Sequence, residues 1–191
     1  MRWAMVLRFA TAVVVIAATV VGCGQPEPAE VLRTAYDLGK EDRWDEAIPL
    51  IKRYVQSHPD RVDGHFLLGM AHMYTRAQVV ATGIAEGEMQ LALALYAASG
   101  DLGILAADMT PEEFKVAAQR ETAYAHIWWI QQARSEGLPV AFVVPRLHAA
   151  LTFVERGLEV DAESEELTQI QERIHYYLEQ FEERNGGAVA L

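Results

Sequence analysis

Apolar residues recur at helical spacing along almost the whole chain after residue 28. The final stretch, expected to form a helix at about 163–184, carries them at steps of three and four residues: Leu167, Ile170, Ile174, Tyr177 and Phe181. A stripe of this kind covers one face of an amphipathic helix. Strand patterns of period two are missing, apart from a short apolar run at 140–144. The sequence therefore predicts an all-α fold.

Breakers and capping residues divide this pattern into separate helices. Before the final one, helices are expected at about 29–40, 44–57, 62–75, 86–98 and 110–135. Gly83 and Gly87 interrupt the stretch before the fourth helix, which is why its start is placed at 86 or 87. The fifth begins at Thr110-Pro111, where Thr can cap the helix, Pro suits the first turn and Glu113 can close a capping box.

Similar residues return 34 positions apart in the first part of this pattern. Leu68-Gly69 follows Thr34-Ala35 at this interval, so a small residue is kept. A second signature has steps of four, three and five residues and is found twice: Ala47, Ile51, Tyr54, Pro59, and again Ala150, Val154, Gly157, Ala162. Alanine or glycine at such positions lets two helix backbones approach closely.

These residues resemble the tetratricopeptide repeat (TPR), a helix hairpin of period 34. Tyr54 departs from the family pattern, because it is large where a small residue is usual, and Ala162 replaces the proline. The resemblance is good over 31–74, fair over 147–177 and poor between. It implies a right-handed array of antiparallel helix hairpins over 29–184, with an insertion at about 76–139 and a flexible tail at 185–191.

Cys23, the only cysteine, ends a basic and apolar leader. Val20-Val21-Gly22-Cys23 resembles the lipobox of a bacterial lipoprotein signal peptide. The resemblance implies that residues 1–22 are cleaved, that Cys23 carries diacylglycerol and palmitate, and that 23–28 form a short tether. An ordinary secretory signal and an uncleaved membrane anchor remain as alternatives. All three place residues 29–184 outside the cytoplasm.

Residue 24 and the charge balance bear on localisation. In the lipoprotein family, an aspartate after the cysteine marks inner-membrane retention; Gly24 therefore implies the outer membrane, facing the periplasm, in a diderm cell. The chain has 27 Asp and Glu against 16 Lys and Arg, and loss of Arg2 and Arg8 would raise the acidic excess from 11 to 13. Such a surface repels phosphate backbones and anionic lipid heads, so nucleic acid is not an expected partner. Membrane attachment would come from the lipid on Cys23, and no other cofactor is expected.

Histidines and carboxylates give only weak hints of chemistry. The chain has no serine nucleophile elbow, Gly-rich phosphate loop or Cys-His arrangement, so we predict no enzyme and no catalytic residue. His65 and His72 are seven residues apart, which is not the spacing of a helical zinc pair, and a packing role is favoured over a metal site. His126 and His148 could serve acid–base chemistry only if they meet a carboxylate such as Glu121.

The TPR resemblance implies a protein-binding groove lined by the first helix of each hairpin. The candidate partner-binding residues on that face are Arg33, Asp37, Lys40, His65 and Tyr74. Trp128 and Trp129 are added, because adjacent tryptophans point about 100° apart on a helix, so that one can face a core and the other a groove or a partner. A helix packed between two neighbours, with both rings buried, is the alternative and is somewhat favoured. The expected function is a scaffold or adaptor for a protein partner in a cell-envelope assembly.

The alternative is a lipoprotein that binds a small apolar ligand for a transporter. The long helix with the two tryptophans and the stretch 89–96 could line a pocket between helices. A closed cavity at Trp128 or Trp129 would support this alternative, whereas an open groove would support a protein partner.

Overall fold

The computed structural model describes residues 27–75, 79–137 and 139–186. The leader and Cys23 lie outside these residues. The described chain is all-helical and has no strand, which confirms the predicted fold class. Its elements are α1 (Pro28–Lys40), α2 (Trp44–Ser57), α3 (Val62–Tyr74), α4 (Val79–Ser99), the 3-10 helix η1 (Gly103–Ala107), α5 (Pro111–Ser135), α6 (Val140–Val160) and α7 (Glu165–Gly186).

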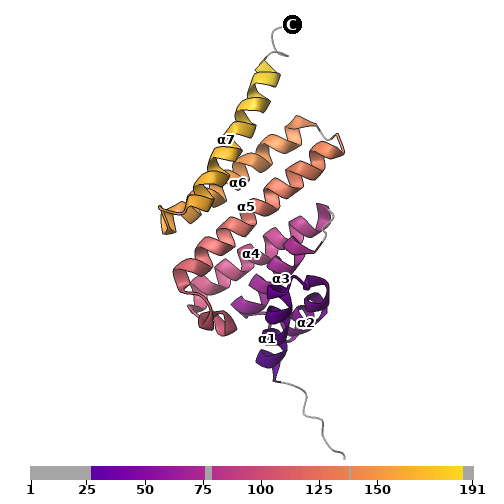
Figure 1. Ribbon diagram of the computed structural model, residues 1–191, viewed down its shortest axis with the longest axis vertical. Coiled ribbons are helices and arrows are strands. Elements are labelled where there is room, and N and C mark those ends of the chain that lie inside the picture. Colours follow the sequence, from indigo (N-terminus) through magenta and orange to yellow (C-terminus); the bar gives the residue numbers. More distant parts are fainter. Residues whose placement is uncertain (1–26, 76–78, 138, 187–191) are drawn as a thin grey trace, which may run out of the picture.

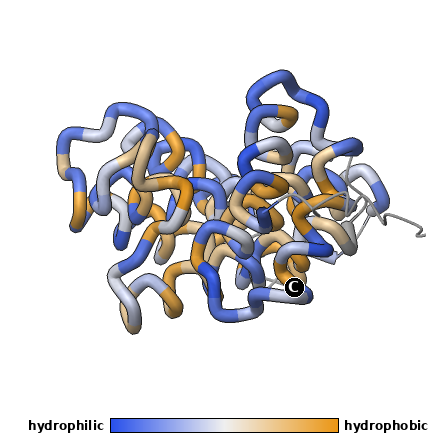
Figure 2. The backbone as a smooth tube through the Cα atoms, turned by 90° about the horizontal axis from the view of Figure 1, so that it is seen from below, coloured by the Kyte–Doolittle hydropathy of each residue, from blue (hydrophilic) through white to orange (hydrophobic). Residues whose placement is uncertain are grey.

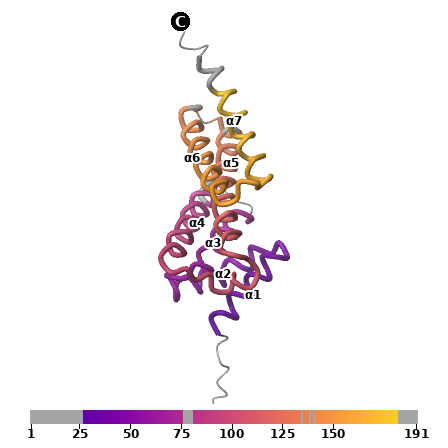
Figure 3. Tube along the Cα trace, turned by 90° about the vertical axis from the view of Figure 1, so that its left-hand side faces the viewer, coloured from indigo at the N-terminus to yellow at the C-terminus, as the bar shows by residue number. Residues whose placement is uncertain are grey.

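Consecutive helices pack side by side as an array of antiparallel hairpins (Figure 1). The hairpins are α1–α2, α3–α4 and α5–α6, and α7 packs against α6 at the end of the array. Seen from the side, α4 and α6 lie toward one face, and α1, α5 and α7 toward the other (Figure 3). This is the TPR-like architecture expected from the sequence, with α1, α3 and α5 as the first helices of their hairpins.

Small residues allow the close helix contacts on which the array depends. A Cβ on Gly39 would lie 2.5–2.9 Å from ring atoms of Trp44, so only glycine lets this ring cover the end of α1. A Cβ on Gly157 would lie 2.7 Å from Leu167 Cδ1, at the contact between α6 and α7. Ala47 and Ala150, the first residues of the repeated signature, are completely buried. The signature thus marks positions where backbones approach each other.

Hydrophobic residues follow the inner sides of the helices, whereas the turns are hydrophilic (Figure 2). They form two main cores. One joins α1–α5 and contains Leu32, Ile51, Leu67 and Phe114, and the other joins α5–α7. No helix among the described residues is long and apolar enough to cross a membrane.

Two helices differ from the sequence expectation. α4 begins at Val79, not near 86, so Gly83 and Gly87 lie inside it. Each glycine weakens a helix by about 1 kcal/mol, but both are exposed, while Ala85 and Met89 on the opposite face are completely buried. Burial of that face outweighs the glycine penalty. The apolar run 140–144 is the first turn of α6, the second helix of the third hairpin.

Candidate functional site

A hollow of about 440 Å³ opens between α1, α3 and α5, the first helices of the three hairpins. We call it the inner pocket. Most of its wall is aromatic or aliphatic, which suits an apolar side chain better than a charged one. The lining residues are Tyr36, Gly39, Lys40, Asp42, Trp44, Phe66, Leu67, Met70, Tyr74, Met109, Ala117 and Arg120.

Tyr74 is fixed by contacts of its ring and of its hydroxyl. Its ring stacks on Trp44, with 5.9 Å between centroids and 20° between planes. Its hydroxyl donates to Glu121 Oε2 at 3.1 Å, and Arg120 holds the other carboxylate oxygen of the buried Glu121 at 2.8 Å. Burial and the charge of Glu121 raise the pKa of Tyr74 well above its ordinary value. Tyr74 therefore stays a neutral hydroxyl, and its exposed ring forms a rigid wall of the pocket.

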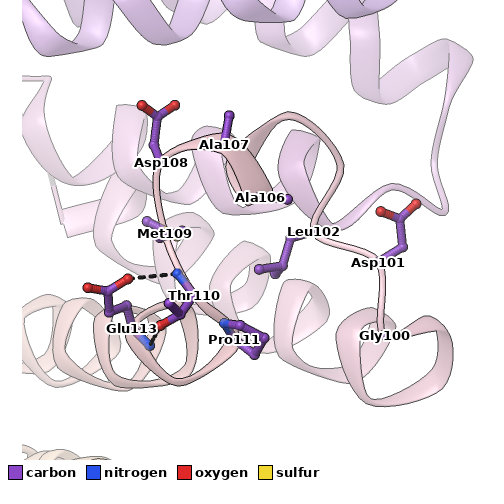
Figure 4. Close-up of a pocket in the computed structure, with 10 residues that line it drawn as sticks. All are labelled: Gly100, Asp101, Leu102, Ala106, Ala107, Asp108, Met109, Thr110, Pro111 and Glu113. Atoms are coloured by element: carbon purple, nitrogen blue, oxygen red, sulfur yellow. Dashed lines mark hydrogen bonds between the residues drawn. The ribbon is translucent and has the colours of Figure 1, made fainter.

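Residues 100–110 join α4 to α5 and include η1; we call this segment the strap. Its acidic residue Asp108 accepts a hydrogen bond from Arg33 Nη1 at 2.7 Å and lies 3.4 Å from Lys40 Nζ. The hydrogen bond from Arg33, supported by Lys40, holds the pKa of Asp108 below its ordinary value. Figure 4 shows Asp108 among the residues that line a hollow between the strap and the start of α5. With its lowered pKa, Asp108 is a stable anion on the strap, beside α1.

The other end of the strap is held by a buried carboxylate on α3. Asp63 Oδ2 accepts the backbone N–H of Ile104 at 2.9 Å, and Oδ1 accepts that of Gly64 at 2.9 Å. Gly103 has a φ of +57°, and a Cβ there would collide with Asp63 and with Arg61. Glycine is therefore required for the strap to approach α3 so closely.

A second hollow lies farther along α5, on the side of α7. A smaller hollow of about 170 Å³ lies between α5 and α7, and Tyr124 and Glu166 form part of its wall. The Tyr124 hydroxyl donates to Glu166 Oε1 at 3.3 Å. Ala117, Tyr124 and Trp128 are seven and four residues apart, so they lie on one face of α5. This face connects the inner pocket, the smaller hollow and Trp128 into the surface that we call the inner groove.

The structure brings some of the predicted partner-binding residues to this groove. Lys40 and Tyr74 line the inner pocket, and Arg33 lies beside them at the strap. Asp37 is exposed on α1 but is not among the residues that line the pocket. His65 must be corrected. It is only 4% exposed, and its ring nitrogens lie 2.6 Å from Glu88 Oε2 and 2.8 Å from the Pro59 carbonyl oxygen.

His65 thus packs between α3 and α4, where the contacts of the hairpin require its burial. Of the two tryptophans, one is exposed and the other packs against a core, as expected for side chains that point about 100° apart on a helix. Trp128 is 43% exposed on the groove face of α5, whereas Trp129 packs against the core of α5–α7 with Arg146 Cζ 5.0 Å from its ring centroid.

The residues considered for chemistry do not form a catalytic group. His126 is buried, with Nε2 3.5 Å from Glu86 Oε1 and Nδ1 3.3 Å from Arg146, whereas His148 is exposed on α6. Glu121 is held by Arg120 and Tyr74 instead. Among the described residues, no group of three or more His, Cys, Asp or Glu could hold a metal ion.

Several groove residues were not singled out from the sequence. Trp44, Met70 and Met109 line the inner pocket, but each occurs in a pattern that also fits ordinary core packing. Asp108 gave no signal, because its importance depends on the fold of the strap.

The fold and its groove define a TPR-like array of helix hairpins. No family profile matches the chain, and no curated protein matches it. Among solved structures, the chain is similar to the first TPR of Spaghetti (RPAP3) bound to the HSP90 peptide SRMEEVD. The TM-score is 0.53 at 19% sequence identity, and the match covers 79% of this chain and 95% of that one. At this identity the similarity shows the fold.

Proposed function

We propose that this chain is a lipid-anchored adaptor of the cell envelope whose inner groove holds a segment of a protein partner. The observation that carries the proposal is the inner pocket, an open and mostly apolar hollow on the face of a TPR-like array. The similar TPR structure is described with a bound peptide, which supports peptide binding as the use of this face. Rigid aromatic rings such as those of Trp44 and Tyr74 are typical anchors of a binding site.

The anchoring part of the proposal rests on Cys23 and the lipobox that precedes it. A lipid at this residue, followed by a short tether, would hold the array close to a membrane surface. The groove would then meet partners in the envelope, not in the cytoplasm. Replacement of Cys23 by Ala should abolish incorporation of an alkyne-labelled fatty acid and release the protein from the membrane fraction; labelling that persists would contradict the lipid anchor.

Site-specific photo-crosslinking in cells tests the groove. A photoreactive phenylalanine replaces Met70, whose side chain lines the inner pocket, in the full-length chain. A matched control places the same group at Glu155, which is exposed on α6. We expect one envelope protein to be captured from position 70 and not from position 155. Equal capture from both positions, or none from position 70, would refute groove binding.

The small-ligand alternative receives less support. Ligand binding would require a closed cavity around Trp128 or Trp129. Trp128 is 43% exposed, so its ring is not enclosed. The inner pocket has a volume in the range of ligand sites, but it is open along the groove. Native mass spectrometry of the purified protein would favour the alternative if a copurified apolar compound were present in equal amount.

A further inference from the structure

The strap lies against α1 and α3, beside the inner pocket, and is held through its main chain as a bound peptide would be. Side chains of these two helices hold both backbone groups of Ile104: its N–H donates to Asp63 Oδ2 at 2.9 Å, and its carbonyl accepts from Arg33 Nη2 at 2.8 Å. Arg33 and Asp63 come from α1 and α3, the first helices of the first two hairpins. Contacts to the main chain hold a segment irrespective of its side chains. The chain itself therefore occupies this place at the edge of the inner pocket, which Met109 of the strap helps to line.

This internal occupant is a permanent part of the fold. Leu105 is completely buried and Leu102 almost so, and both belong to the core that joins α1–α5. Both leucines would lose their burial if the strap moved out. The buried carboxylate of Asp63 would also lose the hydrogen bond that it accepts from Ile104 N–H. The strap is consequently a fixed wall of the groove and does not open as a lid.

The strap also changes the charge of the groove. Asp108 lies between Arg33 and Lys40, at 2.7 and 3.4 Å, so it pairs with both cations on α1 and offsets one of their two charges. Lys40 and Arg120 are the basic residues that line the inner pocket. Arg120 is also paired: it lies 2.8 Å from Glu121 and 2.9 Å from Glu166. An acidic segment that entered the pocket would thus find these cations already bound to carboxylates.

We propose that Asp108 determines the specificity of the groove by excluding acidic segments. The inference rests on the proposed function, because it takes the inner groove as the peptide site. The partner segment is then apolar or amphipathic with basic flanks. A large apolar side chain enters the pocket between Tyr74 and Met109, and the acidic surface of the chain attracts the flanks. This chemistry is opposite to that of the heptapeptide SRMEEVD, which has three acidic residues.

The test removes Asp108 and measures binding of a defined acidic probe. Full-length protein in mild detergent is titrated into fluorescein-labelled SRMEEVD, and fluorescence anisotropy reports binding. We expect Asp108→Ala to bind this probe about two- to fivefold more tightly than the wild type, because ion pairs as exposed as those of Arg33 and Lys40 change an affinity by no more than that. The double variant Asp108→Ala, Lys40→Ala should lose part of the gain, since one of the two freed cations is gone.

Asp101→Ala is the matched control. Asp101 is an exposed carboxylate on the same strap, but it pairs with Arg61 at 2.8 Å, away from the residues that line the inner pocket. It should leave the affinity for SRMEEVD unchanged. A wild type that binds the probe as tightly as Asp108→Ala, no gain in Asp108→Ala, or an equal gain in Asp101→Ala would each overturn the role of Asp108.

This result is independent of the cross-linking experiment. The probe titration asks whether Asp108 masks the groove cations, whereas capture from position 70 asks whether the groove holds a cellular partner. Loss of capture together with a normal gain in Asp108→Ala would refute the proposed function alone. Capture with no gain in Asp108→Ala would refute the specificity role alone. Circular dichroism of each variant confirms that the helical fold is kept.

Discussion

Alanine substitution at two glycines of the strap should separate backbone strain from the contact with Asp63. Gly100 and Gly103 both have positive φ, +68° and +57°. A Cβ at Gly100 would meet no atom within 4 Å, whereas one at Gly103 would displace the carboxylate of Asp63. A left-handed conformation costs a residue with a Cβ about 1–2 kcal/mol. Gly100→Ala should therefore lower the free energy of unfolding by about 1–2 kcal/mol.

Gly103→Ala carries the same strain and an additional loss. The buried Asp63 accepts hydrogen bonds from Ile104 and Gly64, and a side chain pushed away from one of them leaves a buried polar group unsatisfied. That loss is about 1–3 kcal/mol, so the total is about 2–5 kcal/mol. Urea denaturation followed by circular dichroism at 222 nm gives both free energies. Equal losses in the two variants would show that the contact with Asp63 contributes nothing.

A double-variant cycle makes the same test sharper. If the collision with Asp63 causes the excess, Gly103→Ala should have a smaller effect when Asp63 is already Ala, and the two changes should not be additive. The same cycle with Gly100→Ala should be additive, because a Cβ at Gly100 would meet no atom within 4 Å and so would not touch Asp63. Additivity in both cycles would refute the view that Asp63 anchors the strap in the groove.

The other predictions concern α3 and the tryptophan pair. The hydrogen bond that His65 donates to the Glu88 carboxylate raises the pKa of His65 above 6.5, so its stabilising effect is complete below pH 6.5 and is lost as the pH rises through the folded-state pKa. Burial lowers the pKa of His72, so stability falls as the pH drops from 6.5 through its folded-state pKa. The urea midpoint of unfolding, measured against pH, should no longer decline at alkaline pH in His65→Gln. In His72→Gln it should no longer decline at acidic pH. An unchanged pH curve in either variant would contradict the assignment of that decline to the replaced histidine. Trp128→Ala should reduce cross-linking of the partner from position 70 about tenfold or more, with little loss of stability. Trp129→Ala should instead lower the free energy of unfolding by about 1–3 kcal/mol. Equal effects of the two variants on cross-linking would show that Trp128 does not contact the partner.

Much of the array could be predicted because its determinants are local. The recurrence of small residues at Ala35 and Gly69, and the repeated signature that begins at Ala47 and Ala150, reflect contacts between neighbouring helices. Those contacts lie close in sequence, so they leave a visible period. The start of α4 was predicted wrongly because Gly83 and Gly87 signal a break locally, while the burial of Ala85 and Met89 comes from helices elsewhere in the chain.

The groove could be predicted less well, because its key contacts join distant parts of the chain. Arg33 and Lys40 were recognised as groove residues, but their partner Asp108 lies 75 and 68 residues away. No local pattern marks an aspartate that will fold back onto α1. His65 was misplaced for a related reason: its position in the hairpin repeat was clear, but its burial depends on Glu88 and on the carbonyl of Pro59.

If the inner groove holds a partner segment as proposed, the strap also sets how long that segment can be. It closes the groove at Met109, and the exposed ring of Trp128 marks the far end of the groove face on α5. Ala117, which faces Met109 in the inner pocket, precedes Trp128 by eleven residues, a helical distance of about 16 Å. A helix of about three turns or an extended segment of about five residues spans this length. Under the proposed function, the connection between α4 and α5 would therefore limit the partner segment in length and in charge at once.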